Sequence, residues 1–539
     1  MLQVIVIGGG ATGAGILRDL ALRGIRAALV EQGDLVAGTS SRYHGLLHSG
    51  GRYAVKDPES ARECASENRI LRRIAPWAVE PCGGIFLQLE QDDPAYAGRW
   101  VTACREAGVP VEPLDLDRLR AEEPGISSRA VAAYRTQDAS IDGFRLVTAN
   151  VAAAERLGAR VLTYRKVIGL LMEGGRVTGV RLRNKRTGEE ERLEAELVIN
   201  AAGAWAAQVT AMAGIPLDLV ADRGVLLVYH GRLTSRVVNR LRPPGNADIF
   251  VPAGSVTLLG TTATPVSDPD DHTIEPAEVE ELLRLGCELL PAAADARILR
   301  AFAGIRPLFG PGGGGGAGST RDLPRTYQVV DHHRVHGVPG LLSILGGKLT
   351  TYREMAEKVV DAAAGILGNT APCRTAEEPL LPEPDPTLVS RITSLAGPAR
   401  AAAILERHPA DLENVAGALA EPRGAEVLCE CEQVTQGEVL AVARRLDHPS
   451  LDDIRRRTRL GMGTCQGAFC GYRAAVALTP VVGAPAVTGL LLDFQSERWR
   501  GVASALPGPE LRGAELTYAI YAGLVGKEGR NDAEKAPGL

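Results

Sequence analysis

The alternation of apolar and polar positions is most regular at the N-terminal end of the chain. Residues 2–7 form a short run rich in valine and isoleucine, which is typical of a buried parallel strand. Apolar residues then recur at helical spacing over 14–23 and stop at Gly24. A second apolar run at 26–30 ends at Glu31. The pattern predicts a β-α-β unit with an acidic residue at the tip of its second strand.

Similar patterns predict further elements along the chain. Helices are expected at 59–74, 101–107 and 144–157, and another that ends near 367. Strands are expected at 85–89, 160–164, 177–183, 197–200, 223–229, 249–252, 256–260 and 341–345. The strands 160–164 and 177–183 are expected to flank a turn at 173–175, and those between 223 and 260 to be antiparallel. These elements predict an α/β protein in which a nucleotide-binding unit is combined with antiparallel strands.

The pattern changes after residue 373. Residues 373–426 are rich in proline, alanine and glutamate and are expected to contain a linker and a small helical region. A new unit begins at 427, with helices expected at 437–446 and 451–457. Near-helical spacing within 499–539 fits either a docking helix for another subunit or the closing helix of the last domain, and we favour the second.

Composition limits the class of protein. The chain has 539 residues, of which 45% are hydrophobic and 23% charged, and a net charge of -5, as in ordinary globular proteins of about three or four domain-sized units. The mild acidity disfavours a nucleic-acid binder. The absence of an apolar run of about 18 residues predicts no membrane span, and no basic residues precede the first strand as in a signal peptide. We therefore expect a cytoplasmic protein with reduced thiols.

The turn of the first unit has the G-x-G-x-x-G spacing. Gly8 allows a tight turn, Gly10 lets the backbone approach a pyrophosphate, and Gly13 lets helix and strand pack closely. The helix N-terminus favours phosphate, and Glu31 can accept hydrogen bonds from an adenosine ribose. The strand–turn–helix context favours dinucleotide binding over a plain glycine-rich turn, but it does not distinguish NAD from FAD.

Three later segments are rich in glycine and hydrogen-bonding groups. Residues 38–53 suit a loop laid along an extended cofactor. Residues 200–205 form a small-residue turn after a strand, which is either a second contact with the cofactor or a plain turn. Residues 346–353 form a glycine turn before a helix, whose N-terminus can face an anionic group.

Four of the nine cysteines are clustered near the C-terminal end, at Cys429, Cys431, Cys465 and Cys470. In a reducing compartment, four thiols in a compact all-helical unit indicate a metal site rather than disulfides. The C-x-C pair is tight for a zinc knuckle, whereas iron–sulfur sites accept varied spacings. We favour an iron–sulfur cluster, with zinc as the alternative. A cluster that passes single electrons suits transfer to a partner protein.

Several segments together resemble the FAD-dependent glycerol-3-phosphate dehydrogenases: VIVIGGGATGAGILRDLALRG, HGLLHSGGRY, GIRPL and GGKLTTYR. The cysteine unit is similar to the BFD-like [2Fe-2S] domain of the A subunits of the anaerobic, three-subunit enzymes, including the wide spacing of its second cysteine pair. The resemblance implies a Rossmann-like FAD-binding domain of the glutathione-reductase and D-amino-acid-oxidase type, an interleaved antiparallel-sheet substrate domain, and a small α-helical BFD-like domain.

The resemblance also implies domain boundaries and cofactor contacts. The FAD-binding domain would comprise 1–75, 140–215 and 335–370, the substrate domain 76–139 and 216–334, a linker or helical region 371–425, the BFD-like domain 426–480 and a C-terminal region 481–539. The FAD contacts would be Gly8, Gly10, Gly13, Glu31, Ser40, Ser41, His44, Gly45, Leu46, Val167, Ala202, Gly203, Lys348, Leu349 and Thr350.

The implied substrate is sn-glycerol 3-phosphate, oxidised to dihydroxyacetone phosphate by hydride transfer to FAD. The implied substrate contacts are Arg52, Tyr53, Arg306, Arg325 and Lys348. This set suits a phosphate monoester, because arginine binds phosphate oxygens bidentately. Arg321 is an alternative to Arg325, because the low-complexity segment 311–318 makes the correspondence ambiguous.

The implied catalytic set is His48, Arg306 and Lys348. His48 is the candidate base for the substrate hydroxyl, and Arg306 is the alternative through stabilisation of alkoxide charge. Electrons would leave through partner subunits B and C to a quinone, with the protein held peripherally at the inner face of the membrane. The competing interpretations are an FAD-dependent amine or 2-hydroxy-acid oxidoreductase of the same fold and a non-catalytic flavin and iron–sulfur electron-transfer subunit.

Overall fold

The computed structural model describes residues 2–309, 320–506 and 508–525. The chain divides into two compact units. The first contains Met1–Arg297, Phe302–Asp385 and Leu405–Ala410, and the second contains Ile298–Ala301, Pro386–Ile404 and Asp411–Leu539. The low-complexity segment 311–318 and the last part of the segment 499–539 lie outside the described residues.

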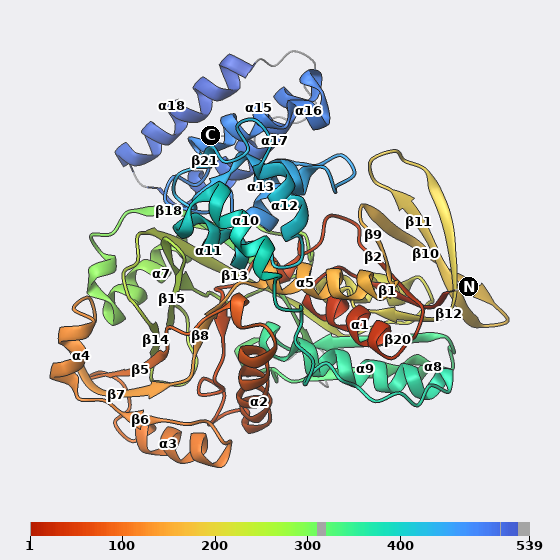
Figure 1. The fold of residues 1–539 in the computed structure, drawn as a ribbon. Coiled ribbons are helices and arrows are strands. Elements are labelled where there is room, and N and C mark those ends of the chain that lie inside the picture. Colours follow the sequence, from red (N-terminus) through yellow and green to blue (C-terminus); the bar gives the residue numbers. More distant parts are fainter. Residues whose placement is uncertain (1, 310–319, 507, 526–539) are drawn as a thin grey trace. The chain divides into compact units, whose positions relative to one another are not determined.

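The first unit contains an eight-stranded sheet (Figure 1). Its strands are β1 (Leu2–Ile7), β2 (Ala27–Val30), β9 (Arg160–Leu162), β10 (Arg165–Glu173), β11 (Arg176–Asn184), β12 (Glu190–Asn200), β19 (Tyr327–Asp331) and β20 (Leu341–Gly346). The order is β10-β11-β12-β1-β2-β9, and β20 pairs with both β12 and β19. β1 is parallel to β2 and β12, with Ile7 level with Val30 and Asn200. The turns that follow β1, β2, β12 and β20 therefore meet at one edge of the sheet.

Both faces of β1 are buried, which explains its continuous apolar sequence. Val4 and Val6 belong to one hydrophobic cluster, and Ile5 and Ile7 belong to another. Such a strand, covered on both faces, is typical of the parallel sheets of α/β proteins. The helices of this part are α1 (Ala11–Leu22), α2 (Pro58–Ile74), α5 (Gly143–Arg156), α6 (Ala206–Ala211), α8 (His332–His336) and α9 (Tyr352–Leu367). α1 packs against both α5 and α9 (Figure 1).

A second sheet has nine strands, which belong to the first unit except for residues 298–301. They are β5 (Gly84–Leu89), β6 (Glu112–Pro113), β7 (Ala130–Thr136), β13 (Leu219–His230), β14 (Val237–Arg240), β15 (Ile249–Ala253), β16 (Val256–Gly260), β17 (Thr264–Val266) and β18 (Ile298–Phe309). Most of its pairs are antiparallel, as expected, although β14 and β5 are parallel. The helices that follow these strands in the chain are α3 (Tyr96–Glu106), α4 (Leu116–Glu122) and α7 (Pro276–Leu289), and a three-stranded sheet adds β3 (Leu46–Leu47), β4 (Val79–Glu80) and β8 (Ala139–Ile141).

Three local expectations need correction. The turn at 173–175 joins β10 to β11, whereas β9 pairs with β2 in the parallel sheet. The strand expected at 197–200 begins at Glu190, because its charged first half pairs with β11 in a partly exposed ladder that needs no apolar pattern. The helix expected at 101–107 begins earlier, at Tyr96.

The second unit is mostly helical. Its helices include α10 (Pro386–Ala396), α12 (Leu412–Leu419), α13 (Gln436–Ala443), α14 (Leu451–Thr458), α15 (Cys470–Ala477), α16 (Thr479–Val482), α17 (Ala484–Ala503) and α18 (Gly508–Val525), while α11 (Pro398–Arg407) crosses the division between the units. The strands β21 (Val427–Cys429) and β22 (Val434–Thr435) form a small antiparallel pair, so the unit is not all helical. Across the described residues, no helix is long and apolar enough to cross a membrane.

Candidate functional site

The turn between β1 and α1 has the geometry that its glycines predict. Gly8 has a φ of +113°, and a Cβ atom there would lie 2.5 Å from the Ala201 carbonyl oxygen. A Cβ atom on Gly13 would lie 1.9 Å from the carbonyl oxygen of Gly8, so α1 crosses the end of β1 too closely for any side chain. Gly10 lines a cavity. The turn therefore presents bare backbone to that cavity.

Glu31 is held at the end of β2 by two backbone amides. Its Oε2 atom accepts a hydrogen bond from Gly9 N at 2.7 Å, and Oε1 accepts one from Gly33 N at 2.8 Å. Burial raises the pKa of the carboxyl, against the effect of these amides. Each carboxylate oxygen keeps a further lone pair for a hydroxyl donor.

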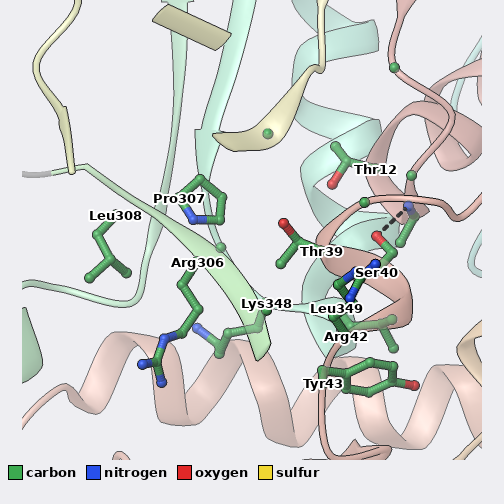
Figure 2. A pocket seen from close by; sticks show the side chains of 18 of the residues that line it. Thr12, Thr39, Ser40, Arg42, Tyr43, Arg306, Pro307, Leu308, Lys348 and Leu349 are labelled. Carbon is green, nitrogen blue, oxygen red and sulfur yellow. Dashed lines mark hydrogen bonds between the residues drawn. The ribbon is translucent and has the colours of Figure 1, made fainter. Parts of the chain in front are cut away.

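The segment after β2 returns to the same turn. Ser40, in the 3-10 helix η1 (Thr39–Ser41), accepts a hydrogen bond through its Oγ atom from Ala11 N at 3.0 Å (Figure 2). The N-cap of α1 is Gly10, which has no side chain to supply this bond. Ser40 thus caps the helix from a distant position, which local sequence patterns do not reveal.

A cavity of about 1120 Å³ is lined by residues of both large sheets of the first unit. Seventeen of the predicted site residues line it: Gly8, Gly10, Glu31, Ser40, His44, Leu46, His48, Arg52, Tyr53, Val167, Ala202, Gly203, Arg306, Arg325, Lys348, Leu349 and Thr350. Gly13, Ser41 and Gly45 are not part of the lining. Ser41 Oγ donates to Gly38 O at 2.9 Å, and Gly45 O accepts from Ile141 N at 2.7 Å. Gly13, Ser41 and Gly45 therefore fix the backbone next to residues that line the cavity.

Cationic side chains gather in one part of this cavity. They are Arg52, Arg306, Arg321, Arg325 and Lys348. Arg306 pairs with buried Asp222 at 2.7 Å, and Arg52 pairs with buried Asp248 at 3.3 Å. Burial, together with the positive charge of neighbouring arginines, lowers the pKa of Arg306 to about 10 and that of Arg321 to about 9. The region therefore disfavours further positive charge and favours an anion.

Arg321 and Arg325 are not exclusive alternatives, because both line the cavity. Arg321 Nη2 donates to the carbonyl oxygen of Thr261 at 2.9 Å and also to Asn246 Oδ1. Arg325 contributes its backbone as well, since its N–H donates to Asp57 Oδ2 at 3.0 Å.

Lys348 approaches the same region from the glycine turn after β20. Its Nζ atom donates to the carbonyl oxygen of Arg325 at 2.7 Å and to Ser60 Oγ at 3.0 Å, and it lies 3.6 Å from Glu63 Oε2. It also lies 5.0 Å from the centre of the Tyr53 ring. Figure 2 draws Lys348 and Arg306 among the residues that line this cavity. Helix α2, which carries Ser60 and Glu63, thus helps to position Lys348.

Two histidines, the buried His48 and the half-buried His44, lie beside the cations. The His44 and His48 ring centres are 5.6 Å apart, and the His48 ring centre is 5.2 Å from that of Tyr53. Burial, with added repulsion from cations such as Arg52, lowers the pKa of His44 to about 3 and that of His48 well below its usual value. Both rings are therefore neutral at neutral pH, and a neutral imidazole nitrogen can accept a proton.

Several contributors were not predicted from the sequence. Asp222, Asp248 and Glu63 are the carboxylates that hold the cations, and each comes from an element distant from its partner. No local motif marks them, so only their spatial proximity identifies them. Thr12 also lines the cavity (Figure 2), and its place inside the glycine motif was an available signal.

The four clustered cysteines come together in the second unit. Hydrogen bonding with Cys470 lowers the pKa of Cys429 to about 7 and that of Cys465 to about 5. Cys431 also contributes to the lowered pKa of Cys465. The strand β21 with the turn that follows it, the loop before α15 and the start of α15 therefore bring the four cysteines together.

Three glycines close the loops around these sulfurs. Cβ atoms on Gly461, Gly467 and Gly471 would lie 3.0, 2.6 and 3.0 Å from the ring of Phe494 on α17. Backbone amides of the same loops, at Gly461 and Gly467, hydrogen-bond to Cys429 and Cys465 and favour their thiolate forms.

Comparison with known proteins gives a consistent result for the whole chain. Residues 3–353 match the model of the FAD dependent oxidoreductase family, and residues 427–478 match that of the BFD-like [2Fe-2S] binding domain. The chain is 43% identical to the A subunit of the anaerobic glycerol-3-phosphate dehydrogenase of Escherichia coli, over 98% of this chain and 97% of that protein. It belongs to the family of these A subunits.

A second A subunit and a solved structure with a similar fold give the same result. The A1 subunit of the anaerobic glycerol-3-phosphate dehydrogenase of Haloferax volcanii is 41% identical, over 98% of this chain and 91% of that protein. The structure of the glycerol-3-phosphate dehydrogenase of Bacillus halodurans complexed with FAD has a TM-score of 0.69 at 22% identity, and the match covers 94% of this chain and 96% of that one. The predicted fold class, FAD and the [2Fe-2S] cluster are confirmed at the level of the family.

The first unit has the features that the FAD of this family requires. The bare backbone at Gly10 and the N-terminus of α1 can hold a pyrophosphate, and Glu31 keeps lone pairs for the ribose. A volume of about 1120 Å³ exceeds that of ordinary small-molecule sites and suits a long ligand with room for a substrate.

The second unit has the donor set of the cluster found in this family. Four cysteines, two of them with a lowered pKa, are the ligands that a [2Fe-2S] cluster takes. The match of residues 427–478 to the BFD-like [2Fe-2S] model favours the cluster over the zinc alternative.

Proposed function

We propose that this chain oxidises sn-glycerol 3-phosphate to dihydroxyacetone phosphate as the catalytic subunit of a quinone-linked dehydrogenase. The observation that carries the proposal is the group of half-buried cations next to a buried, neutral His48 in the cavity of the FAD unit. It is consistent with the names of the relatives, which are glycerol-3-phosphate dehydrogenases.

The cations explain recognition of a phosphate monoester. Such a group carries close to two negative charges, and an arginine fork can bind two of its oxygens at once. The lowered pKa values of Arg306 and Arg321 reflect burial and mutual repulsion, which a bound dianion would relieve. An amine or a 2-hydroxy acid with one carboxylate has less use for so many cations.

The neutral His48 explains how the substrate hydroxyl loses its proton. Its imidazole can accept the proton from the hydroxyl on C2 while the hydrogen on the same carbon leaves as hydride, which FAD accepts when bound. The dianionic phosphate would also offset the positive charges of Arg52 and Lys348, which depress the pKa of His48. Arg306 is the alternative, through stabilisation of negative charge on that oxygen.

The second unit supplies an exit for the electrons. A [2Fe-2S] cluster held by Cys429, Cys431, Cys465 and Cys470 passes single electrons, which suits delivery to partner subunits B and C and then to a quinone. These partners would hold the protein at the inner face of the membrane.

We assign the domains as the resemblance implies. FAD is assigned to 1–75, 140–215 and 335–370 and the substrate to 76–139 and 216–334, with 371–425 as a linker or helical region, 426–480 as the cluster domain and 481–539 as the C-terminal region. The strand order supports the first two assignments, because the parallel core β2-β1-β12-β20 and the nine-stranded sheet are built from these two sets of segments.

The test is anaerobic reduction of the bound flavin in the purified holoprotein. Glycerol 3-phosphate is expected to bleach the flavin absorption band within a single turnover. Glycine, sarcosine and 2-hydroxyglutarate, added at the same concentration, are expected to leave it unchanged.

The outcomes separate the competing interpretations. Bleaching by one of the other three compounds and not by glycerol 3-phosphate would assign the chain to amine or 2-hydroxy-acid oxidation. A flavin that dithionite reduces but none of the four compounds reduces would indicate a pure electron-transfer subunit.

A further inference from the structure

A threonine hydroxyl lies against one of the clustered cysteines. Thr464 Oγ1 is 3.3 Å from Cys431 Sγ, although the two residues are 33 positions apart in the chain. A cysteine that ligates iron does so as a thiolate, which has no proton to donate. In the loaded protein, Thr464 is therefore the donor of this hydrogen bond.

A buried amide lies close to another of the cysteines. Gln495 on α17 is only 2% exposed, and neither its Nε2 nor its Oε1 atom has a hydrogen-bond partner among the described residues. A Cβ atom on Gly471, the residue after Cys470, would lie 3.7 Å from Gln495 Nε2. The amide thus faces the backbone that carries Cys470.

An unsatisfied buried amide is costly, so it calls for a partner. The neighbouring Phe494 packs on Gly461, Gly467 and Gly471 and closes this side of the cysteine loops. Gln466, next to Cys465, shows the contrast, because its Nε2 atom donates to the carbonyl oxygens of Met462 and Gly463. We therefore expect the partner of the Gln495 amide to be a sulfur atom at the cluster.

We propose that Thr464 and Gln495 are positioning residues that raise the reduction potential of the [2Fe-2S] cluster. Thr464 donates a hydrogen bond to the Cys431 thiolate, and Gln495 donates one to sulfur on the Cys470 side. Such bonds stabilise the reduced cluster, because the added electron increases the negative charge on sulfur. The inference rests on the cluster of the family and is independent of the substrate.

The test is a redox titration of the full-length holoprotein, followed by EPR of the reduced cluster, with Thr464→Val and Gln495→Met. Both changes keep the approximate shape of the side chain and remove the donor. Each is expected to retain iron and to lower the ratio of reduced to oxidised cluster at a fixed potential by roughly tenfold. For a one-electron couple, this corresponds to a midpoint lower by about 59 mV.

Two variants serve as controls. Thr464→Ser keeps the hydroxyl and is expected to keep the wild-type potential. Ser496→Ala removes a hydroxyl that donates to Leu492 O of the same helix, next to Gln495 on α17. This variant is expected to keep the wild-type potential.

Unchanged reduction potentials or loss of iron in the variants would also be informative. Fully loaded Thr464→Val and Gln495→Met variants with unchanged potentials would overturn the proposal and leave both groups with a purely structural role. If Thr464→Val loses iron and Thr464→Ser keeps it, the result supports a role of the hydroxyl group. If both variants lose iron, Thr464 acts through the packing of its side chain, and the proposal is contradicted. Loss of iron in Gln495→Met counts against the proposal, because methionine preserves the side-chain length.

Discussion

At the scale of single residues, the cavity depends on cations that are held by partners before any substrate binds. Arg306 is fixed by Asp222, Arg52 by Asp248, and Lys348 by Ser60 and the Arg325 carbonyl oxygen. Side chains held in this way lose little conformational entropy when an anion arrives. The proposed substrate contacts are thus largely preorganised.

Replacing Arg52 tests the recognition of phosphate. The Arg52→Gln variant is expected to raise KM for glycerol 3-phosphate by about 10- to 100-fold, because it removes a charged hydrogen-bond donor. Asp248 keeps its pairing with Arg242 at 2.8 Å, so the fold should persist. Steady-state kinetics check this, with Arg99→Gln, at an exposed pair with Asp93, as the matched control that should behave as the wild type.

Replacing His48 tests the proton acceptor. The His48→Asn variant is expected to slow flavin reduction by between about 100-fold and 10,000-fold, because an amide cannot take the proton. Stopped-flow measurement of a single anaerobic turnover gives this rate directly. An unchanged rate would eliminate His48 as the base and leave Arg306 as the candidate.

The pH dependence of the same step follows from the burial of His48. Because its pKa lies well below the usual value, the ring stays neutral as the pH falls through the range in which an exposed histidine becomes protonated. The rate of flavin reduction in the wild type is therefore expected to stay level between about pH 8 and pH 6.5. A fall in the rate near pH 6.5 that persists when glycerol 3-phosphate saturates the enzyme at each pH would show a base with an ordinary pKa.

At the scale of elements, the first β-α-β unit was predictable because its signals are local. The glycine spacing, the apolar runs and Glu31 all lie within one continuous stretch of sequence. The capping of α1 by Ser40 and the pairing of the charged half of β12 with β11 depend on residues brought together only by folding. The same holds for the carboxylates behind the cations, so the substrate cavity could be predicted only in part.

Gly13 tests the close crossing of α1 and β1. The Gly13→Ala variant is expected to lose about 3 kcal/mol or more of folding stability and much of its FAD, because the new Cβ atom would meet the Gly8 carbonyl oxygen. Thermal unfolding and the flavin content of the purified protein measure both effects.

Gly98 provides the matched control, since it also lies within a helix, α3, but has nothing within 4 Å of the added Cβ position. Gly98→Ala is expected to stabilise the protein by about 0.5–1 kcal/mol through the higher helix propensity of alanine. Equal behaviour of the two variants would contradict a steric role for Gly13.

At the scale of the whole molecule, the two candidate sites belong to different units. The flavin cavity is lined entirely by residues of the first unit, and the four cysteines lie in the second. Each site is therefore expected to bind its own group independently of the other.

Cys465→Ser tests this independence. The variant is expected to lose its iron but to keep FAD, with flavin reduction by glycerol 3-phosphate within about twofold of the wild-type rate. Its turnover with a one-electron acceptor protein should fall to background. Iron and flavin analysis with single-turnover kinetics measure these effects. Cys287→Ser, at a free cysteine on α7 outside both sites, should leave iron, flavin and turnover unchanged.

The strand order of the parallel sheet also has a consequence for biosynthesis. β1 is translated well before its neighbour β12, which spans Glu190–Asn200, and before the next strand, β20, which spans Leu341–Gly346. The edge of β1 that pairs with β12 therefore stays unpaired while much of the nascent chain is translated. Unpaired apolar strands of this kind are prone to aggregation, and chaperones protect them. Flavin loading must then follow the synthesis of β20, because the glycine turn after that strand completes the wall of the cavity.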